Sequence, residues 1–373
     1  MILPGAMLGV LGGGQLGRMF AVAARNLGYR VMVLDPDPNS PAGAMADEHL
    51  QADYQDPEAL EHMGALCAAI TTEWENVPAR TLEALAHHCP VRPAGEATAV
   101  ARDRIREKTF VRDLGLATAP FFPILASADL DSAVAGLRLP ALLKTATLGY
   151  DGKGQAEVST REEAHAAFSQ MGAVPCVLEE KVALHQELSV VLVRGVDGEV
   201  EVYPVGENVH RNGILHTTLV PGRIAPAMAE RAIAMARAMA EDLDYVGVLA
   251  VEFFLTRDGE LLVNEMAPRP HNSGHYTLDA CASSQFEQQV RALCGLPLAS
   301  TRLLSPAVMV NLLGDLWTRG EPDWSRLLAQ PEVKLHLYGK RQARPGRKMG
   351  HFTLLGANVD ANLSLALSLH EEL

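Results

Sequence analysis

The sequence predicts a mixed α/β and α+β protein of three lobes, and three observations support this prediction. Apolar runs of strand length alternate with helical patterns over roughly the first 95 residues, which is typical of a parallel α/β unit. The chain has 373 residues, two to three times a usual domain of about 150 residues. Neither an internal repeat nor a low-complexity tract is evident, so we expect lobes joined without long linkers.

The N-terminal lobe, expected over residues 1–96, begins with a strand, a glycine turn and a helix. Met7 to Leu11 is a short apolar run, and after three glycines the apolar residues of Gln15 to Leu27 are spaced as in a helix. Two further apolar runs, Tyr29 to Leu34 and Ala68 to Thr72, have the character of buried strands. We therefore expect a Rossmann-like parallel sheet here.

The middle and C-terminal lobes are expected over residues 97–178 and 179–373. The middle lobe should open with a helix over 97–114, followed by a strand at 140–146, a glycine-rich loop, a helix at 160–171 and a strand at 176–181. The C-terminal lobe should combine long strands with helices. We expect strands at 187–193, 199–205, 246–255 and 261–265, and helices at 227–243 and 284–294.

Charge and cysteine content restrict the partners and the location. The chain has 45 acidic residues against 32 Lys and Arg, a net charge of −13, which is the wrong sign for a nucleic-acid-binding surface. The five cysteines are odd in number, and the closest pair, Cys281 and Cys294, is 13 residues apart, so we expect reduced thiols. No apolar run approaches the ~18 residues of a membrane span, so we predict a cytoplasmic protein without a membrane partner.

A glycine motif follows the first predicted strand. Gly12, Gly14 and Gly17 form the pattern GxGxxG at the start of a helix, and Asp35 stands near the position of an acidic ribose ligand. The pattern fits a dinucleotide, another phosphate-bearing ligand at the helix N-terminus, or a purely structural turn. A Walker P-loop is excluded, because Arg18 stands where that motif needs its lysine.

A second glycine-rich segment, GYDGKG at residues 149–154, lies between two predicted strands. Mobile backbone with a cation suits a cover for a triphosphate, and Lys144 supplies a second cation one strand earlier. The alternative is an ordinary hairpin turn with a solvated lysine.

Two carboxylates are predicted to face each other across a hairpin. Asp258 and Gly259 are a turn signal, and in a hairpin centred there Glu252 and Glu265 lie opposite one another. Directly opposed carboxylates repel unless a cation lies between them, and magnesium is held by one or two carboxylates together with substrate phosphates. The pair therefore predicts a magnesium site, with a solvent-facing acidic pair as the alternative.

Three further segments carry candidate binding groups. Arg269 and Asn272 follow the second glutamate closely enough to share its site, whereas a zinc-binding helix at His271 is disfavoured by the Ser-Gly pair that follows. The segment EEKV at 179–182 suits a hinge that contacts an adenine edge, with Glu187 beyond it to accept from ribose hydroxyls, and the alternative is an ordinary connection between two strands. The segment KRQARPGRK at 340–348 concentrates basic residues in an acidic protein, which indicates either a phosphate anchor or a solvated loop.

Taken together, these segments resemble an ATP-grasp ligase. More narrowly, the sequence is similar to the 5-(carboxyamino)imidazole ribonucleotide synthase family of purine biosynthesis. The resemblance runs from about Met7 to Gly356 and rests on six motifs in order, GGGQLGRM, TTEWENVP, YDGKGQ, ENVHRNGIL, NEMAPRPHNSGH and RPGRKMGH. One small departure is Trp74, where a phenylalanine-type aromatic is more usual.

The resemblance implies a three-domain ATP-grasp fold, usually a homodimer, that consumes ATP and bicarbonate to carboxylate the amine of aminoimidazole ribonucleotide. It implies magnesium, or Mn²⁺, at Glu252 and Glu265. Carried over by motif, the ATP-binding residues would be Arg104, Lys108, Lys144, Gly149, Tyr150, Asp151, Gly152, Lys153, Gly154, Gln155, Glu179, Glu180, Lys181, Val182, Glu187, His210, Asn264 and Glu265.

The same resemblance implies a ribonucleotide site and a set of catalytic residues. The substrate-binding residues would be Gln15, Leu16, Glu73, Asp151, Arg269, His271, Asn272, Lys340, Arg347 and Lys348, and the catalytic ones Tyr150, Asp151, Lys153, Arg269 and Asn272. Three alternatives remain open. They are a related formyltransferase acting on glycinamide ribonucleotide, a dinucleotide-dependent oxidoreductase, and a nucleotide sensor without catalysis.

Overall fold

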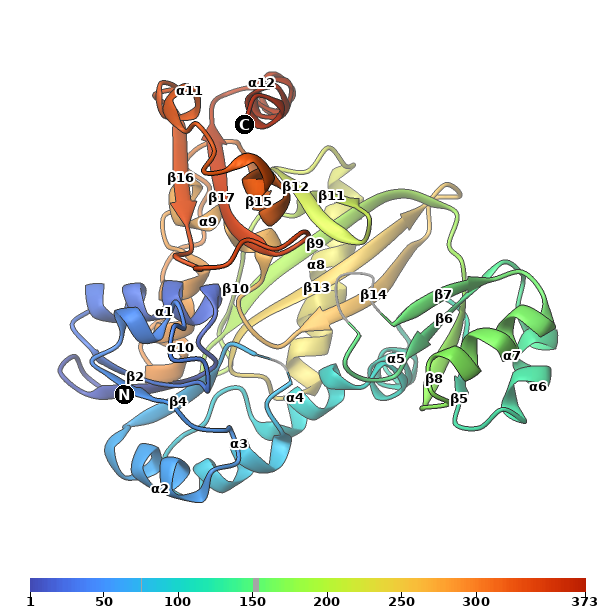
Figure 1. Ribbon diagram of the computed structural model, residues 1–373, viewed down its shortest axis with the longest axis horizontal. Coiled ribbons are helices and arrows are strands. Elements are labelled where there is room, and N and C mark those ends of the chain that lie inside the picture. The colour runs from blue at the N-terminus through green and yellow to red at the C-terminus, as the bar shows by residue number, and fades with distance from the viewer. Residues whose placement is uncertain (75, 150–153) are drawn as a thin grey trace.

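The computed structural model describes residues 1–74, 76–149 and 154–373, and its described strands form three sheets (Figure 1). The N-terminal sheet is parallel throughout, as predicted, with strand order β3-β2-β1-β4. Both faces of this sheet are covered, which explains the continuous apolar runs. Its strands are β1 (Met7–Leu11), β2 (Arg30–Leu34), β3 (Glu48–Leu50) and β4 (Ala69–Thr72).

The helices of this unit bury one apolar side each. In α1 (Gln15–Asn26), the side chains of Phe20 and Ala24 are almost fully buried in the same core as Val31 and Val33 of β2. The other elements of the unit are η1 (Gly43–Met45), α2 (Pro57–Leu66) and α3 (Ala79–Ala86).

The single helix predicted over 97–114 is wrong, because two helices occupy this range. They are α4 (Gly95–Arg102) and α5 (Arg104–Asp113). Asp103 separates them, since its carboxylate accepts hydrogen bonds from the backbone N–H groups of Ile105 at 2.8 Å and Arg106 at 3.2 Å and so starts a new helix. The break places Arg104 at the first position of α5.

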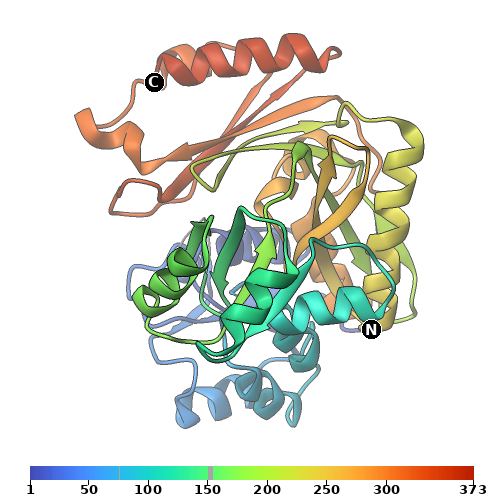
Figure 2. The same cartoon turned by 90° about the vertical axis from the view of Figure 1, so that its right-hand side faces the viewer.

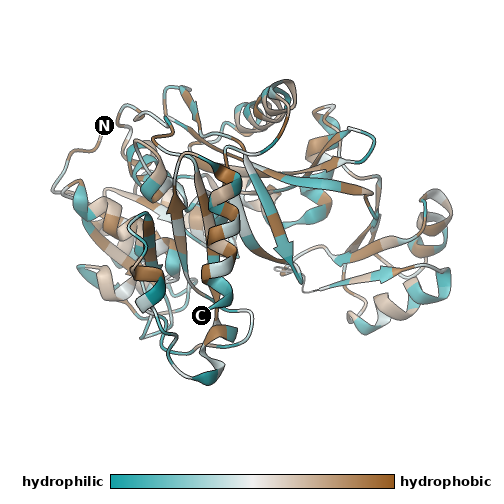
Figure 3. Cartoon of the chain, turned by 90° about the horizontal axis from the view of Figure 1, so that it is seen from above, coloured by the Kyte–Doolittle hydropathy of each residue, from teal (hydrophilic) through white to brown (hydrophobic). Residues whose placement is uncertain are grey.

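A small antiparallel sheet with order β5-β8-β6-β7 forms the middle unit, which stands at the right of both Figures 1 and 3, away from the rest of the chain. The domain division stays a prediction, and the boundary placed at 178/179 falls inside β8. The elements are β5 (Phe121–Ile124), α6 (Asp129–Gly136), β6 (Ala141–Thr145), β7 (Gln155–Val158), α7 (Arg161–Gln170) and β8 (Cys176–Glu180).

The third sheet has nine strands in the order β14-β13-β9-β11-β12-β15-β17-β16, with β10 paired to β9. The strands are β9 (Leu184–Arg194), β10 (Val200–Val202), β11 (Gly206–Arg211), β12 (Ile214–Val220), β13 (Gly247–Thr256), β14 (Leu261–Ala267), β15 (Ala307–Leu313), β16 (Val333–Leu337) and β17 (Lys348–Leu355). The helical elements are α8 (Pro226–Asp242), η2 (Asn272–Gly274), α9 (Thr277–Ala280), α10 (Gln285–Cys294), η3 (Gly314–Arg319), α11 (Ser325–Leu328) and α12 (Val359–Glu371).

Alternate residues of β9 enter two different cores, which shows that both faces of this sheet are covered. Val190 packs with Met239 of α8, whereas Val191 packs with Tyr276 and with Ala292 of α10. Further along the sheet, α12 covers β15 and β17, as Figure 2 shows at the top of the view. Within the described ranges, no helix is long and apolar enough to cross a membrane.

Candidate active site

A cavity of about 530 Å³ lies where the three units meet. Every unit contributes to its wall, and so do α4 and α5, which connect the first unit to the second. The lining residues are Gly14, Gln15, Leu16, Glu73, Trp74, Asn76, Ala101, Arg102, Arg104, Glu107, Leu142, Lys144, Leu148, Gly149, Gln155, Glu187, His210, Gly213, Leu215, Glu252, Phe254, Asn264, Glu265, Met266, Ala267, Arg269, His271, Asn272 and Lys348.

The glycine turn of the N-terminal unit is occupied by a carboxylate of the protein itself. The carboxylate of Glu73 accepts hydrogen bonds from the backbone N–H groups of Gly14 at 2.5 Å and Gly17 at 2.8 Å, at the N-terminus of α1. Gly12 has a φ of 108°, and a Cβ atom there would lie 2.6 Å from the Cγ atom of Glu73, so this turn requires glycine. These amides therefore hold a carboxylate at the position where a phosphate could have been bound.

Asp35 is engaged in the same turn, which contradicts its interpretation as a ribose ligand. Its carboxylate accepts hydrogen bonds from the backbone N–H of Gly13 at 2.6 Å and from the Tyr54 hydroxyl at 2.7 Å, and the residue is buried. Together with Glu73, Asp35 makes the GxGxxG pattern a structural turn. The dinucleotide-dependent oxidoreductase, which rested on this pattern, loses its support.

The predicted opposition of Glu252 and Glu265 is confirmed. The two residues are cross-strand partners in the antiparallel pair β13 and β14. The register near the turn differs from the expected one by one residue, because Phe253 pairs with Val263. A bulge at Asn264 takes up this extra residue and brings the two glutamates opposite each other. Their role as metal ligands stays a prediction.

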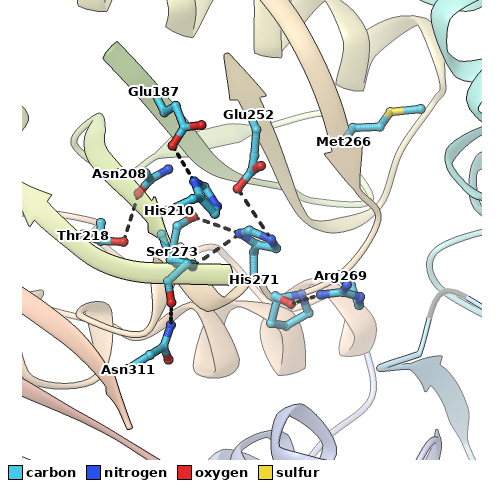
Figure 4. Close-up of polar contacts among 12 residues, drawn as sticks. Glu187, Asn208, His210, Thr218, Glu252, Met266, Arg269, His271, Ser273 and Asn311 are labelled. Atoms are coloured by element: carbon cyan, nitrogen blue, oxygen red, sulfur yellow. Dashed lines mark hydrogen bonds and ion pairs between the residues drawn. The ribbon is translucent and has the colours of Figure 1, made fainter. Parts of the chain in front are cut away.

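The charges around this pair are unevenly balanced. Burial, together with the facing carboxylate of Glu265, raises the pKa of Glu252 to about 7. The positive charges of His210 and Lys348 act in the opposite direction. Burial alone would lower the pKa of His210, but a contact of 2.5 Å between its Nδ1 atom and the Oε2 atom of Glu187 contributes to a net rise (Figure 4).

His271 presents a neutral imidazole to the same pair. Figure 4 shows it between Glu252 and Ser273, with its Nε2 atom 3.8 Å from the Oε1 atom of Glu252. The backbone N–H of Ser273 donates to Nδ1 of His271 at 3.3 Å, which leaves the hydrogen of a neutral ring on Nε2. Burial, reinforced by Arg269, lowers the pKa of His271 well below its ordinary value. The ring can therefore donate a hydrogen bond at the carboxylate pair.

Two lysines share one buried carboxylate at the border of the middle unit. Lys144 of β6 forms an ion pair with Glu179, and Lys108 of α5 contacts the second oxygen of that carboxylate at 2.7 Å. Burial by itself would raise the pKa of Glu179, but the two ammonium groups outweigh it and lower the pKa to about 2. Lys144 also lines the cavity, whereas Lys108 lies behind it, within 3.3 Å of Thr118.

The basic segment 340–348 reaches the cavity through one of its members. Lys348, the first residue of β17, lines the cavity, and the Lys340 ammonium donates to the Lys348 carbonyl oxygen at 2.7 Å. Arg347 donates to the carbonyl oxygen of Gln342 at 2.8 Å in its own loop. Of the three residues predicted to contact a phosphate, Lys348 therefore lines the cavity, whereas Lys340 and Arg347 lie outside its lining.

Most of the predicted site residues meet in this one cavity. Those that line it are Gln15, Leu16, Glu73, Arg104, Lys144, Gly149, Gln155, Glu187, His210, Glu252, Asn264, Glu265, Arg269, His271, Asn272 and Lys348. Those placed by the structure outside the lining are Lys108, Gly154, Glu179, Glu180, Lys181, Val182, Lys340 and Arg347. Tyr150, Asp151, Gly152 and Lys153 lie outside the described residues.

Several lining residues were not predicted. Glu107 of α5 is fully buried, and burial and the nearby Glu265 raise its pKa to about 8, while its Oε1 atom accepts from the backbone N–H of Met266 at 2.5 Å. Arg102 donates to the carbonyl oxygen of Val77 at 3.2 Å. The acidic and basic residues of 102–108 were the available signal, but their pattern is equally typical of a solvated helix face.

Three family models match along the chain. They describe a ribonucleotide synthetase preATP-grasp domain at residues 6–102, an ATP-grasp domain at 109–286, and a phosphoribosylaminoimidazole carboxylase C-terminal domain at 307–364. The first match covers the N-terminal sheet, the second covers the middle sheet and strands β9 to β14 of the nine-stranded sheet, and the third covers strands β15 to β17 of that sheet. Fold and site together define a member of the ATP-grasp ligases.

Curated relatives and solved structures narrow this class. The N5-carboxyaminoimidazole ribonucleotide synthase of Bacillus subtilis is 46% identical over 95% of this chain and 93% of its own length, and that of Brucella melitensis is 44% identical over 94% and 96%. The crystal structure of the Thermus thermophilus N5-carboxyaminoimidazole ribonucleotide synthetase matches with a TM-score of 0.92 at 43% identity, covering 98% of both chains. The chain belongs to the N5-carboxyaminoimidazole ribonucleotide synthase family.

A more distant member carries ligands. The Aspergillus clavatus N5-carboxyaminoimidazole synthase, solved in complex with ADP and 5-aminoimidazole ribonucleotide, matches with a TM-score of 0.89 at 30% identity, covering 99% of both chains. The shared fold therefore extends over the whole chain at this lower identity.

Proposed function

We propose that this protein carboxylates 5-aminoimidazole ribonucleotide with bicarbonate at the expense of ATP, giving 5-carboxyaminoimidazole ribonucleotide, ADP and phosphate in purine biosynthesis. One observation carries the proposal. A carboxylate pair suited to a nucleotide-bound metal and a set of cations suited to anionic substrates line a single cavity in a chain of this family. The ligands named for the Aspergillus relative, ADP and 5-aminoimidazole ribonucleotide, are a product and a substrate of this reaction and so support the proposal.

One end of the cavity suits the nucleotide. Arg104 and Lys144 supply positive charge there, and Glu187 with His210 supplies groups that can contact a base or ribose. Glu252 and Glu265 would hold magnesium, since hard carboxylate oxygens are its preferred ligands and the raised pKa of Glu252 reflects an uncompensated pair. Mn²⁺ accepts the same oxygen ligands. The metal would supply charge stabilisation at the phosphates.

The other end suits the ribonucleotide. Gln15, Leu16 and Glu73 lie at the start of α1 and the end of β4, and Lys348 adds a cation from the C-terminal strands. An acidic protein needs such a local positive charge to bind a substrate phosphate. We therefore assign the 5'-phosphate to the side of the cavity formed by Lys348.

The reaction then proceeds in two transfers. A bicarbonate oxygen attacks the γ-phosphorus of ATP, the bond to ADP breaks, and carboxyphosphate forms. The exocyclic amine of the ribonucleotide attacks the carboxyl carbon, the bond to phosphate breaks, and the amine loses a proton. Arg269 and Asn272 stand beside the carboxylate pair, where they would orient bicarbonate and stabilise negative charge on the transferred group.

The test is ADP release with magnesium, ATP and bicarbonate, with and without aminoimidazole ribonucleotide. We expect release to depend on both bicarbonate and the ribonucleotide, and Glu265→Gln to abolish it. A parallel assay with formate and glycinamide ribonucleotide tests the related formyltransferase, and activity only in that assay would overturn the proposal. By the same resemblance we propose a homodimer in the cytoplasm, which sedimentation and fractionation would check.

A further inference from the structure

Helix α10 belongs to two cores at once. Phe286, Val290 and Leu293 pack with α1 and with β1 and β2 of the N-terminal unit, and α1 lies directly beside α10 (Figure 1). Ala292, on another side of the same helix, packs in the core of the nine-stranded sheet. The helix is therefore one structural element through which the first and third units contact each other.

A fully buried glutamine lies at this junction. Gln289 is 1% exposed, and both ends of its amide are used. Its Oε1 atom accepts the backbone N–H of Val248 in β13 at 2.6 Å, and its Nε2 atom donates to the Thr71 hydroxyl in β4 at 2.9 Å. One side chain thus connects a strand of the N-terminal sheet with a strand of the nine-stranded sheet.

Close packing fixes this amide in place. A Cβ atom on Gly247, which has a φ of 130°, would lie 3.0 Å from the Oε1 atom of Gln289, so the glycine leaves room for the amide. The backbone of α10 is anchored as well, since Arg92 donates to the Leu293 carbonyl oxygen at 2.5 Å. The two strands therefore have little freedom to shift relative to each other at this point.

Both strands lead directly into the cavity. Thr71 precedes Glu73 by two residues and Val248 precedes Glu252 by four. At the ~3.3 Å rise per residue of a strand, these separations are about 7 Å and about 13 Å. A displacement at Gln289 would therefore change the separation between Glu73 and Glu252, which both line the cavity.

We propose that Gln289 is a positioning residue, which holds the wall that carries Glu73 at a fixed distance from the wall that carries Glu252. The proposal rests on the proposed function for its kinetic consequence, because two substrates bound to different units must meet at reacting distance. Misplacement of bound groups by about 1 Å can cost up to a hundredfold in rate. The geometry itself is independent of which substrates bind.

The experiment removes one hydrogen bond of the bridge that Gln289 forms between Thr71 of β4 and Val248 of β13. Thr71→Val keeps the shape of the side chain and deletes the hydroxyl that Gln289 reaches, whereas Thr71→Ser keeps the hydroxyl. We expect Thr71→Val to lower kcat/KM for the ribonucleotide about tenfold with KM for ATP nearly unchanged. Thr71→Ser should restore the value.

A matched control is Thr301→Val. This substitution deletes another buried hydroxyl. That hydroxyl lies away from the cavity lining, with two acceptors in reach, the Val202 carbonyl oxygen at 2.9 Å and the Oε2 atom of Glu201 at 3.0 Å. It should leave both constants within about twofold. Equal kinetic effects of Thr71→Val and Thr301→Val, or no rescue by Thr71→Ser, would overturn the positioning role.

Hydrogen exchange provides a readout that needs no substrate. The backbone N–H of Glu73 donates to the Leu11 carbonyl oxygen at 3.0 Å at the end of β4. Its exchange should accelerate in Thr71→Val and not in Thr301→Val. If the wild-type protein did not use the ribonucleotide, the proposed function would be wrong, but the exchange rates of the two variants would still test the positioning role of Gln289. Unchanged exchange at Glu73 in Thr71→Val would overturn that role.

Discussion

The glycine turn of the N-terminal unit and the hairpin of β13 and β14 differ in how their charges are compensated. In the turn, the carboxylates of Glu73 and Asp35 accept hydrogen bonds from the glycine amides. Burial raises the pKa of Glu73, and the amides of Gly14 and Gly17 oppose that rise. In the hairpin, Glu252 faces a second carboxylate, and its pKa rises to about 7. Of these two sequence motifs, the hairpin is the one that we propose binds a metal ion.

A binding motif is therefore identified by the charges and hydrogen-bonding groups that have no partner within the folded chain. GxGxxG has the residues of a phosphate site, yet the chain fills that site itself. Two opposed glutamates repel each other, yet a divalent cation between them would turn both carboxylates into metal ligands.

The largest effect is expected for Glu265→Gln. Glu265 would hold the metal ion that stabilises negative charge on the transferred phosphoryl group, so its loss should reduce turnover by about a hundredfold to a thousandfold or more. The fold should remain intact, because the substitution relieves repulsion with Glu252. Steady-state ADP release and thermal unfolding measure the two quantities. Turnover near wild type at saturating magnesium would contradict the account of the hairpin.

Lys144→Met and Lys108→Met test whether Lys144 binds the nucleotide while Lys108 only stabilises the fold. Each removes one partner of the buried Glu179 carboxylate while the other lysine stays, so each should destabilise the protein by about 1.5 to 3 kcal/mol. Lys144 also lines the cavity, so only its variant should weaken ATP binding strongly. Urea unfolding and nucleotide titration check this. Equal losses of ATP affinity would place Lys108 in the nucleotide site, as the sequence resemblance implied.

The same ion-pair network predicts a pH dependence of stability. The folded pKa of Glu179, about 2, lies below the ordinary value of 4.5, so its contribution is fully present above pH 4.5 and is lost as the pH falls toward 2. Lys108→Met should reduce this acid-dependent loss, because the carboxylate then gains less from ionisation. Unfolding free energies measured from pH 5 to pH 2 test it. Parallel curves for the variant and the wild type would contradict this role of Lys108.

A smaller effect is expected in the glycine turn. Glu73→Ala leaves the amides of Gly14 and Gly17 without their acceptor and should destabilise the protein by about 2 to 3 kcal/mol, whereas Glu73→Gln should retain part of that stability. Denaturant unfolding of both variants measures the difference. If Glu73→Ala were as stable as the wild type, the hydrogen bonds from Gly14 and Gly17 to Glu73 would not stabilise the turn.

The smallest and most local effect concerns the basic segment 340–348. Lys348→Ala should weaken ribonucleotide binding about 10-fold to 100-fold, the range for a hydrogen bond to a charged group. Arg347→Ala should have less effect, since Arg347 lies outside the cavity lining. ATP binding should barely change in either variant. Equal weakening of both substrates by Lys348→Ala would remove the phosphate assignment.

The sequence predicted the parallel N-terminal sheet and the opposition of Glu252 and Glu265, because both depend on local periodicity and one turn. The predicted opposition of the glutamates was correct partly by chance. The strand register near the turn is shifted by one residue from the expected one, and the bulge at Asn264 reverses that shift. The closure of the glycine turn was not predictable locally, because Glu73 lies 59 residues from Gly14. The bridge through Gln289 is more distant still, reaching Thr71 across 218 residues.

The most direct test of the central claim is Mn²⁺ binding, followed by electron paramagnetic resonance in the presence of ADP. The account predicts that the wild-type protein binds one Mn²⁺ tightly with ADP, and that Glu252→Gln and Glu265→Gln each lose this binding while keeping affinity for ADP itself within about tenfold. Binding of Mn²⁺ with wild-type affinity by the doubly substituted protein would contradict the assignment of the opposed carboxylates as the metal site.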